Sequence, residues 1–338
     1  MSRPLIVNVD CNFSYDLERQ RITAAGGELV LQRARTEEEI IAACRDATVV
    51  LFENADTPFN ARVISALPRC RAIVRYGVGV DSIDLEAATQ RGIVVANAAD
   101  YCTEEVSDHA VALILAAARR IAVFDRRIRA GGWVGYDPRQ PMRRVAALTL
   151  GLLGWGRIAQ AVARKMAGFR LRILVADPYV KTLPPGAGVQ LVSRDELLRE
   201  SDFLSLHSPL NAETRHLIDA RALGLMKPGA ILVNTSRGGV VDEAALVRAL
   251  QEGRLAGAAL DVFEVEPLPA DSPLRTMEQV VLTPHYAASS KDAMQHLQGT
   301  VADSVAAILQ GYWPPFPVNP RVVPTMALRP WTELPAGR

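Results

Sequence analysis

Three residues with the chemistry to move a proton and to hold a carboxylate each follow an apolar run of this sequence. They are Arg237, Glu266 and His285. Histidine transfers protons near neutral pH, a neighbouring carboxylate orients its ring, and the planar guanidinium group of arginine matches a carboxylate. Each residue alone has a simpler explanation: Arg237 as a phosphate or surface contact, Glu266 as part of a solvated turn, His285 as a loop residue. Together they favour acid–base chemistry on a substrate with a carboxylate.

A second pattern lies in residues 148–178, where an apolar run, a glycine turn, a helical pattern and another apolar run end in an acid. Gly154 allows a sharp turn, Gly156 lets the backbone approach a pyrophosphate, and Ala159 occupies the third glycine position. The helix that begins there directs N–H groups at the phosphates. Asp177 stands where a carboxylate accepts adenosine ribose hydroxyls, and it would repel a 2′-phosphate. A glycine-rich turn of another parallel-sheet protein is the alternative, but the combined pattern favours NAD, and NAD over NADP.

The two patterns combine into one predicted reaction. Arg237 would hold and polarise a 2-oxo acid, His285 would give a proton, and the cofactor would give a hydride. Glu266 would orient His285 and raise its affinity for a proton. The sequence therefore predicts a site for a 2-oxo acid beside a nicotinamide.

Alternating strand and helix patterns predict the scaffold that positions these residues. Residues 4–100 alternate in this way and lack a glycine fingerprint, so they form a parallel-sheet α/β domain without the cofactor. A capping box of Thr36 and Glu39 opens one of its helices. The predicted strands are 5–9, 28–31, 48–52, 71–75 and 93–96, and the predicted helices are 16–25, 36–44, 60–67 and 83–90.

The second half of the chain repeats the alternation with polar residues after each strand, at the edge of the sheet where ligands bind. We expect one long helix over 103–130, an irregular arm over 133–144 and a helix over 289–310. The Pro-rich end, 313–338, is expected to form a tail along the surface. The predicted strands are 148–153, 173–176, 202–206, 230–233, 257–260 and 279–282.

Composition narrows the class of protein. The chain has 338 residues, enough for two domains, and a net charge of +1, which does not favour nucleic acid or an anionic membrane as a partner. The four cysteines form no CxxC pair and no metal-ligand spacing, so free thiols and no metal are expected. The sequence opens into a strand without a signal peptide, and its most apolar stretch, 106–118, is too short to span a bilayer. We expect a cytoplasmic enzyme.

Six segments together carry a family resemblance over about residues 5–320. The chain resembles the D-2-hydroxyacid dehydrogenase family, in the branch that includes D-3-phosphoglycerate dehydrogenase and the C-terminal-binding protein corepressors. The segments are RYGVGVDSIDLEAATQRGIVVAN (75–97), GLLGWGRIAQAVA (151–163), LHSPLNAETRHLI (206–218), LMKPGAILVNTSRGGVVDEAAL (225–246), GAALDVFEVEPL (257–268) and TPHYAASS (283–290).

The resemblance implies two Rossmann-like or flavodoxin-like parallel-sheet domains. The NAD-binding domain, 101–288, is inserted into a substrate domain made of 1–100 and 289–338. It also implies a homodimer through the cofactor domain, which suits the arm at 119–145. Arg237 would bind the carboxylate and carbonyl oxygen of the substrate, and His285, partnered by Glu266, would be the acid in reduction.

Further site residues are implied in the same way. The substrate contacts are Arg75, Tyr76, Val78 and Gly79, the last two through backbone N–H groups. The cofactor contacts are Gly154, Gly156, Arg157 and Ile158 at the pyrophosphate, Asp177 at the ribose, Ser208, Pro209, Thr214 and Thr235 on the adenosine side, His207 and Ser236 nearby, and Asp261 at the nicotinamide carboxamide.

Two departures from the family bear on the substrate. Phosphoglycerate dehydrogenases carry an arginine in the loop after the third strand, where this chain has Glu53, which would repel a substrate phosphate or is simply a solvated loop charge. Tyr76 replaces a small residue and is expected to narrow the pocket. The prediction is an NAD-dependent reductase of the glyoxylate or hydroxypyruvate type. Phosphoglycerate dehydrogenase and an NADH-sensing, corepressor-like binding protein are the alternatives.

Overall fold

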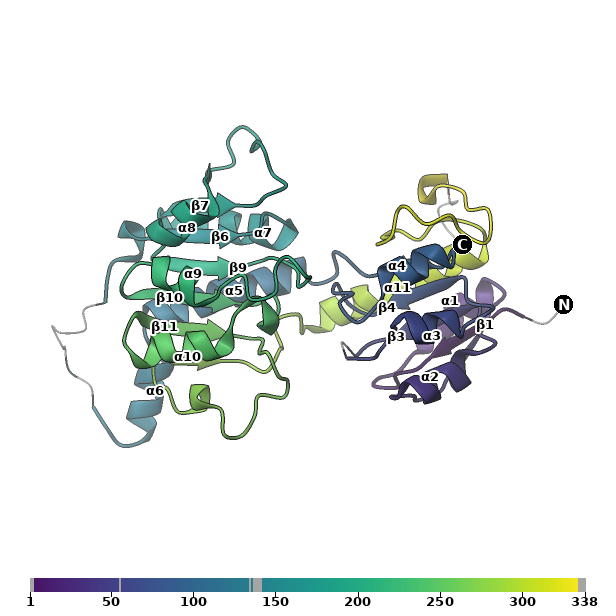
Figure 1. The fold of residues 1–338 in the computed structure, drawn as a ribbon, viewed down its shortest axis with the longest axis horizontal. Helices are drawn as coiled ribbons and strands as arrows, with labels where there is room; N and C mark the ends of the chain where they lie inside the picture. Colours follow the sequence, from purple (N-terminus) through teal and green to yellow (C-terminus); the bar gives the residue numbers. More distant parts are fainter. Residues whose placement is uncertain (1–2, 55, 134, 136–141, 334–338) are drawn as a thin grey trace. The chain divides into compact units, whose positions relative to one another are not determined.

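Short apolar strands pair in parallel to form two separate sheets (Figure 1). The computed structural model describes residues 3–54, 56–133, 135 and 142–333. The chain divides into unit 1, made of Met1–Tyr101 and Ser290–Arg338, and unit 2, the continuous segment Cys102–Ser289. Unit 2 is therefore an insertion in the chain of unit 1. The prediction of two parallel-sheet α/β domains is confirmed.

The sheet of unit 1 has five strands in the order β2-β1-β3-β4-β5. This is the flavodoxin-like order, which places a ligand crevice where the order reverses, between β1 and β3. Successive side chains point to opposite faces: Ile6 packs in one core cluster and Val7 in another. The strands are β1 (Leu5–Asn8), β2 (Glu28–Leu31), β3 (Val49–Phe52), β4 (Ala72–Arg75) and β5 (Val94–Ala96).

Helices cover both faces of this sheet. The predicted capping box is present, because Thr36 Oγ1 accepts from Glu39 N and the Glu39 carboxylate accepts from Thr36 N. The described helices of unit 1 are α1 (Asp16–Ala24), α2 (Glu37–Cys44), α3 (Ala61–Ser65), α4 (Leu85–Gln90) and α11 (Lys291–Leu309).

The sheet of unit 2 has seven strands in the order β12-β11-β10-β9-β6-β7-β8. This order is that of a Rossmann fold extended by one strand, and it reverses between β6 and β9. The strands are β6 (Thr149–Leu153), β7 (Arg172–Ala176), β8 (Gln190–Leu191), β9 (Phe203–Leu206), β10 (Ala230–Asn234), β11 (Leu255–Leu260) and β12 (Val280–Leu282). The short strand β8 was not predicted.

The expected single helix over 103–130 is wrong: two helices, α5 (Thr103–Ala118) and α6 (Ile121–Arg129), replace it. Arg120 separates them with a left-handed backbone, φ 53°. The sequence has no glycine or proline at this point, so no local signal marks the break. The turn lets Val123 of α6 reach the interior, where it is buried. The other described helices of unit 2 are α7 (Arg157–Met166), α8 (Arg194–Glu200), α9 (Ala220–Leu225) and α10 (Glu243–Gln251).

The Pro-rich segment after α11 was expected to form a tail along the surface, but its described part packs into unit 1 through specific contacts. Pro317 forms a bridge with Ala96 beside β5. The Asn319 side chain accepts from Val95 N and donates to Ile93 O, and Val322 is buried. The segment therefore extends the edge of the sheet. Residues 334–338 of the expected tail lie outside the described residues.

The expected arm lies partly outside the described residues, at positions 134 and 136–141. Its described neighbour Trp133 is 88% exposed.

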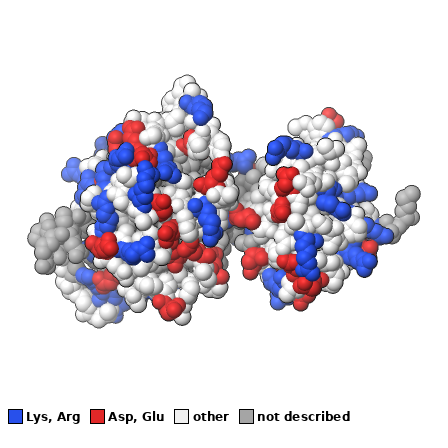
Figure 2. Space-filling model, in the orientation of Figure 1, with Lys and Arg blue, Asp and Glu red and all other residues white. Residues whose placement is uncertain are grey.

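Acidic and basic side chains alternate over each unit on the face shown in Figure 2. No helix in the described ranges has both the length and the apolar character needed to cross a membrane. All four cysteines are free thiols.

Candidate functional site

His285 and Glu266 form a hydrogen-bonded pair in unit 2, with 2.6 Å between His285 Nδ1 and Glu266 Oε2. The other carboxylate oxygen of Glu266 accepts from Phe263 N at 2.9 Å. Burial raises the pKa of Glu266, but the bonds from His285 and Phe263 and the charge of Arg237 outweigh it and leave this pKa below its ordinary value. Glu266 is therefore ionised at neutral pH and accepts from Nδ1–H, which leaves Nε2 to act on a ligand.

Arg237 follows β10 in the same unit, close enough to Glu266 for its charge to act on that carboxylate. The turn that carries it is held by Asn234, whose side-chain nitrogen donates to Arg237 O at 2.9 Å and whose oxygen accepts from Ser236 Oγ at 2.8 Å. Arg237 Nη1 donates to Ser236 O. The structure thus brings Arg237, Glu266 and His285 to the carboxyl edge of one sheet.

Asp261 fixes the loop that carries His285. Its carboxylate is 1% exposed and accepts from Thr283 Oγ1 at 2.6 Å and from the N–H groups of Tyr286 and Ala287 at 3.0 Å. Its backbone oxygen accepts from His285 N at 2.7 Å. His285 itself has a left-handed backbone, φ 54°, which surrounding contacts must hold. The described contacts of Asp261 are thus with the loop that follows β12, and its contact with the nicotinamide carboxamide stays a prediction.

Two residues of this network, His109 and Thr283, were missed as site residues. Thr283 Oγ1 donates to Asp261, so its oxygen accepts from His109 Nε2, 2.9 Å away. His109 Nε2 also lies 3.5 Å from Asp261 Oδ1. A histidine within the apolar pattern of α5 was the available signal, but its partner lies 174 residues away in the sequence.

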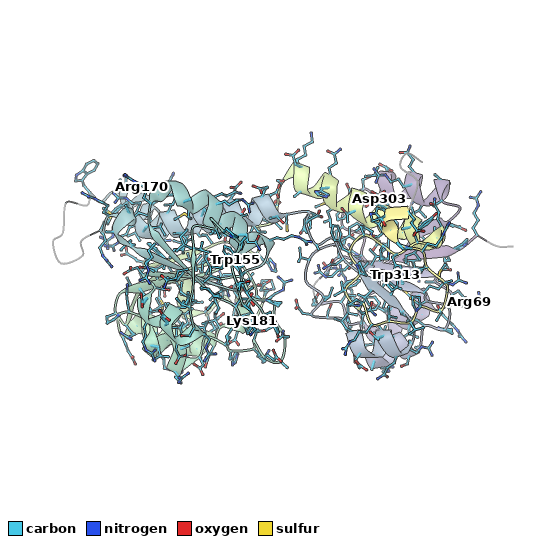
Figure 3. All side chains as sticks on the ribbon, turned by 90° about the horizontal axis from the view of Figure 1, so that it is seen from above. Arg69, Trp155, Arg170, Lys181, Asp303 and Trp313 are labelled. Carbon is cyan, nitrogen blue, oxygen red and sulfur yellow. The ribbon has the colours of Figure 1, made fainter. Side chains whose placement is uncertain are left out.

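The glycine turn after β6 has the geometry that a pyrophosphate needs. Trp155, labelled in Figure 3, lies between the two glycines. Gly154 has φ 97°, and a Cβ atom there would lie 2.9 Å from His207 O, so only glycine suits the position. A Cβ atom on Gly156 would meet nothing within 4 Å, and Gly156 begins α7 without a side-chain cap. Arg157 and Ile158 lie in the first turn of α7, the part of a helix whose N–H groups can bind an anion.

Asp177 lies beside this turn at the end of β7. Its Oδ2 accepts from Trp155 N at 2.8 Å and its Oδ1 from Tyr179 N at 2.9 Å. Both bonds fix the carboxylate next to the glycine turn. This is the geometry of an acid that accepts ribose hydroxyls.

The remaining expected cofactor residues lie at the ends of β9 and β10. Burial lowers the pKa of His207 to about 4, so its ring is neutral, and Nε2 lies 3.0 Å from Ser205 Oγ. Thr235 Oγ1 is buried without a hydrogen-bond partner among the described residues, as expected of a group that meets a ligand. Thr214 Oγ1 donates to Pro209 O, which closes the loop after Ser208. These residues fit a dinucleotide across the β6–β9 reversal.

The expected substrate residues belong to unit 1. Arg75 is 7% exposed, its Nη1 donates to Tyr76 O, and a Cβ atom on Gly77 would lie 1.9 Å from that nitrogen. The Arg75 guanidinium group therefore packs against the backbone of Tyr76 and Gly77 and supports the loop after β4. Among the described residues, the N–H groups of Val78 and Gly79 have no acceptor, so both can bind an anion.

Tyr76 is placed differently from the expectation. Its ring is 4% exposed and packs in the core of unit 1, where its hydroxyl donates to Glu18 Oε1 at 3.0 Å. A side chain inside the core cannot narrow a pocket at the surface of its unit. The reason is strand alternation: Tyr76 follows β4 with its side chain toward α1.

Glu53 lies at the β1–β3 reversal of unit 1. Its N–H donates to Asp10 Oδ2 at 2.7 Å, and its carboxylate accepts from Asn12 Nδ2 at 2.7 Å and from the Tyr15 hydroxyl. Burial raises the pKa of Glu53 despite these bonds. Glu53 is thus built into the ligand edge of this sheet and is not a loosely solvated loop charge.

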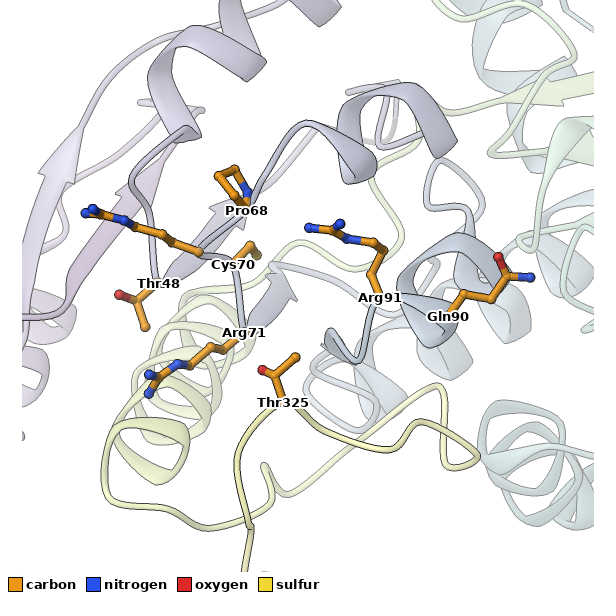
Figure 4. Close-up of a pocket in the computed structure, with 8 residues that line it drawn as sticks. Thr48, Pro68, Cys70, Arg71, Gln90, Arg91 and Thr325 are labelled. Atoms are coloured by element: carbon orange, nitrogen blue, oxygen red, sulfur yellow. The ribbon is translucent and has the colours of Figure 1, made fainter.

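A cavity of about 730 Å³ lies at the other edge of the unit 1 sheet, at the amino ends of its strands (Figure 4). Arg69, Arg71 and Arg91 line it; Arg69 is paired with Asp46 at 3.3 Å, and Arg71 lies 3.9 Å from Met326 Sδ. None of the predicted site residues lines this cavity. Within unit 1, it is separate from the edge that carries Glu53 and Val78.

Comparisons with known proteins agree with this geometry. Residues 111–287 match the family model described as D-isomer specific 2-hydroxyacid dehydrogenase, NAD binding domain. A glyoxylate reductase of Korarchaeum cryptofilum (strain OPF8) is 46% identical over 281 residues, which cover 82% of this chain and 84% of that protein. A D-3-phosphoglycerate dehydrogenase of Mycobacterium leprae (strain TN) is 40% identical over 298 residues, 88% of this chain and 56% of that protein. The crystal structure of a glyoxylate reductase from Paecilomyes thermophila matches with a TM-score of 0.86 and 30% identity, over 94% of this chain and 99% of that one.

The chain thus spans just over half of the phosphoglycerate dehydrogenase and most of the two glyoxylate reductases. The family match includes the glycine turn and all three catalytic candidates. The resemblance predicted from six segments is confirmed, as is an NAD-binding domain. The chain belongs to the D-isomer specific 2-hydroxyacid dehydrogenase family.

Proposed function

We propose that this protein is an NADH-dependent reductase that converts a small unphosphorylated 2-oxo acid, glyoxylate or hydroxypyruvate, to the 2-hydroxy acid, with the D configuration where that product is chiral. The His285–Glu266 pair, with the charge of Arg237 beside it in the NAD-binding unit, carries this proposal. These three groups supply a cation for the carboxylate of such a substrate and a proton for its carbonyl oxygen.

The residues divide the reaction between them. When NADH is bound, its nicotinamide supplies the hydride. Arg237 binds the substrate carboxylate and polarises the carbonyl group. In unit 1, the N–H groups of Val78 and Gly79 are proposed as donors to an anionic group of a substrate. His285 donates the Nε2 proton to the carbonyl oxygen as that oxygen gains negative charge. Glu266 accepts from Nδ1–H and so fixes the orientation of the ring.

Glu53 supports a substrate without a phosphate. Its carboxylate lies at the ligand edge of unit 1, and a fixed acid there repels a phosphate dianion. The greater identity to the glyoxylate reductase, and the larger share of that protein covered, point the same way. Phosphoglycerate dehydrogenase is the second candidate, because a protein of that name is 40% identical to this chain.

Asp177 supports NAD over NADP. Its two bonds to backbone N–H groups keep a carboxylate beside the glycine turn. A 2′-phosphate on the ribose would meet that carboxylate, and the like charges repel. Arg157, Ile158, Ser208, Thr235 and Ser236 are proposed as the neighbouring contacts.

We further propose a homodimer through α6 and the arm that follows it. Ile121, Ile128 and Trp133 are 56%, 53% and 88% exposed, and exposed apolar side chains of this size mark interfaces. Free thiols suit a reducing, cytoplasmic compartment. Sedimentation of Ile128→Glu tests the interface: a monomer supports it, and an unchanged dimer rejects it.

The test of function is NADH oxidation against glyoxylate, hydroxypyruvate, pyruvate, 2-oxobutyrate, phenylpyruvate, 2-oxoglutarate and 3-phosphohydroxypyruvate, with NADPH in parallel. The proposal expects the highest kcat/KM with NADH and glyoxylate or hydroxypyruvate. A preference for the phosphorylated acid would instead establish the second candidate. Tight NADH binding without turnover of any acid would favour a cofactor-sensing protein.

A further inference from the structure

Glu264 and Glu266 stand two residues apart in one loop, and each meets a histidine. Glu266 is bonded to His285, and Glu264 Oε1 is bonded to His216 Nε2. Both histidines have left-handed backbones, with φ 54° at His285 and 50° at His216. Residues other than glycine keep this conformation only where the surroundings hold them. The second pair is thus as firmly placed as the catalytic one, but nothing so far gives it a role.

Further bonds tie Glu264 to the beginning of α10. Glu264 N donates to Glu243 Oε2 at 3.2 Å, and Glu243 N lies 3.4 Å from Glu264 Oε2, which accepts from it. Burial and the charge of Glu264 raise the pKa of Glu243, so the two carboxylates repel each other. The hydrogen bond between His216 Nε2 and Glu264 Oε1 stabilises the Glu264 carboxylate, and this offsets the repulsion from Glu243. His216 N in turn donates to Gly239 O at 2.9 Å.

The same loop lies against the turn that carries Arg237. A Cβ atom on Gly238 would lie 1.9 Å from the carbonyl carbon of Phe263 and 2.5 Å from Glu264 N, so the two backbones are in direct contact. Phe263 N also donates to Glu266. A displacement of Glu264 would therefore move Glu266 relative to Arg237.

We propose that His216 and Glu264 are positioning residues, which hold the segment 263–266 so that Glu266 and His285 stay aligned with Arg237. The inference rests on the proposed function and names a further part of the same site. Neither residue needs to touch the substrate, because both act through the backbone of this segment.

The test compares His216→Ala and Glu264→Gln with Glu200→Gln. Glu200 is a matched control, since it pairs with Arg172 in the same unit and its side chain is 38% exposed, against 27% for Glu264. The chain has five histidines, so each ring can be assigned by substitution in ¹⁵N-labelled protein. The ¹⁵N shifts of His285 report which ring nitrogen carries the proton, and this readout requires no substrate.

We expect both variants, but not the control, to move the His285 shifts away from a fixed Nδ1–H tautomer. We also expect kcat for the preferred 2-oxo acid to fall about tenfold, with the Kd of NADH within twofold of wild type. Unchanged His285 shifts in both variants would overturn the proposal. If the melting temperature fell while the shifts stayed unchanged, the two residues would have a purely structural role. Lack of turnover by the wild type would overturn the proposed function alone. The NMR comparison needs no substrate, so it would still show whether His216 and Glu264 position His285.

Discussion

The backbone of Gly238 lies directly against the backbone of Phe263, where a Cβ atom on Gly238 would come within 1.9 Å of the carbonyl carbon and oxygen. Gly238 follows Arg237, and Phe263 begins the segment that ends in Glu266. The segments that carry the proposed catalytic residues Arg237 and Glu266 are therefore joined without a side chain between them. Any side chain at position 238 must push them apart.

Gly238→Ala is expected to lower the free energy of unfolding by about 3 kcal/mol and to reduce kcat, because the new methyl group has no space. Gly224→Ala is the matched control: Gly224 lies within α9, and a Cβ atom there would meet nothing within 4 Å. That change is expected to stabilise by about 0.5–1 kcal/mol. Urea unfolding measures both, and equal midpoints for the two variants would contradict the packing.

Asp177→Asn is expected to shift cofactor preference toward NADPH. The amide keeps the shape of the side chain but removes the charge that repels a 2′-phosphate. Two charges about 4 Å apart interact by about 1 kcal/mol in water and about 4 kcal/mol at the effective dielectric near a protein surface, so we expect the kcat/KM ratio to move by roughly tenfold or more. Steady-state rates with both cofactors measure the ratio. A ratio equal to that of wild type would remove Asp177 from cofactor selection.

Glu53→Gln is expected to raise kcat/KM for 3-phosphohydroxypyruvate relative to hydroxypyruvate about tenfold. Glutamine retains one oxygen, which can accept from Asn12 Nδ2, and its amide nitrogen can donate to the Tyr15 hydroxyl oxygen, so the loop should keep its structure. Glu28→Gln makes the same charge change at the first residue of β2, at the amino edge of the sheet, and should leave the ratio unchanged. If both variants change the ratio equally, Glu53 does not act locally.

Asp202 should make stability depend on pH. Burial raises its pKa, but bonds from Thr149 N, Arg143 and Lys227 outweigh burial and hold the pKa below the ordinary 3.8. A carboxylate whose pKa is lower in the folded than in the unfolded state stabilises the folded protein at pH values above its unfolded-state pKa. This contribution is lost as the pH falls through the folded-state pKa. Asp202→Asn is therefore expected to cost about 3 kcal/mol at pH 7 and progressively less below pH 3.8.

The control for this prediction is Asp195→Asn, which removes the surface ion pairs of Asp195 with Arg221, Arg199 and Arg194. It should cost less than about 1 kcal/mol at any pH. Unfolding by urea at several pH values compares the two. A cost at Asp202 that does not diminish in acid would show that its charge is not the source of the stability.

The sequence carries much of this fold locally. Apolar runs such as 149–153 and 203–206 predict buried parallel strands, because their side chains face helices on both sides. The capping box at Thr36 and Glu39 and the turn at Gly154 are signals contained within a few residues. The same holds for Asp177, whose distance from the glycines reflects one helix and one strand.

Other features depend on contacts that no local pattern contains. The break at Arg120 accompanies the burial of Val123, and the Tyr76 hydroxyl donates to Glu18, which lies 58 residues away in the sequence. His109 and Thr283 meet across the fold, as do His216 and Glu264, which are 48 residues apart. These pairs form only when the edges of several strands come together, so residue types alone cannot identify them.

The most direct test of the account is the product that wild type and His285→Ala form from hydroxypyruvate and NADH, resolved by chiral chromatography. The account predicts D-glycerate from the wild type. It also predicts a fall in kcat of about 10²- to 10⁴-fold in the variant, with NADH binding retained, because His285 supplies the proton. L-glycerate from the wild type, or undiminished turnover by His285→Ala, would contradict it.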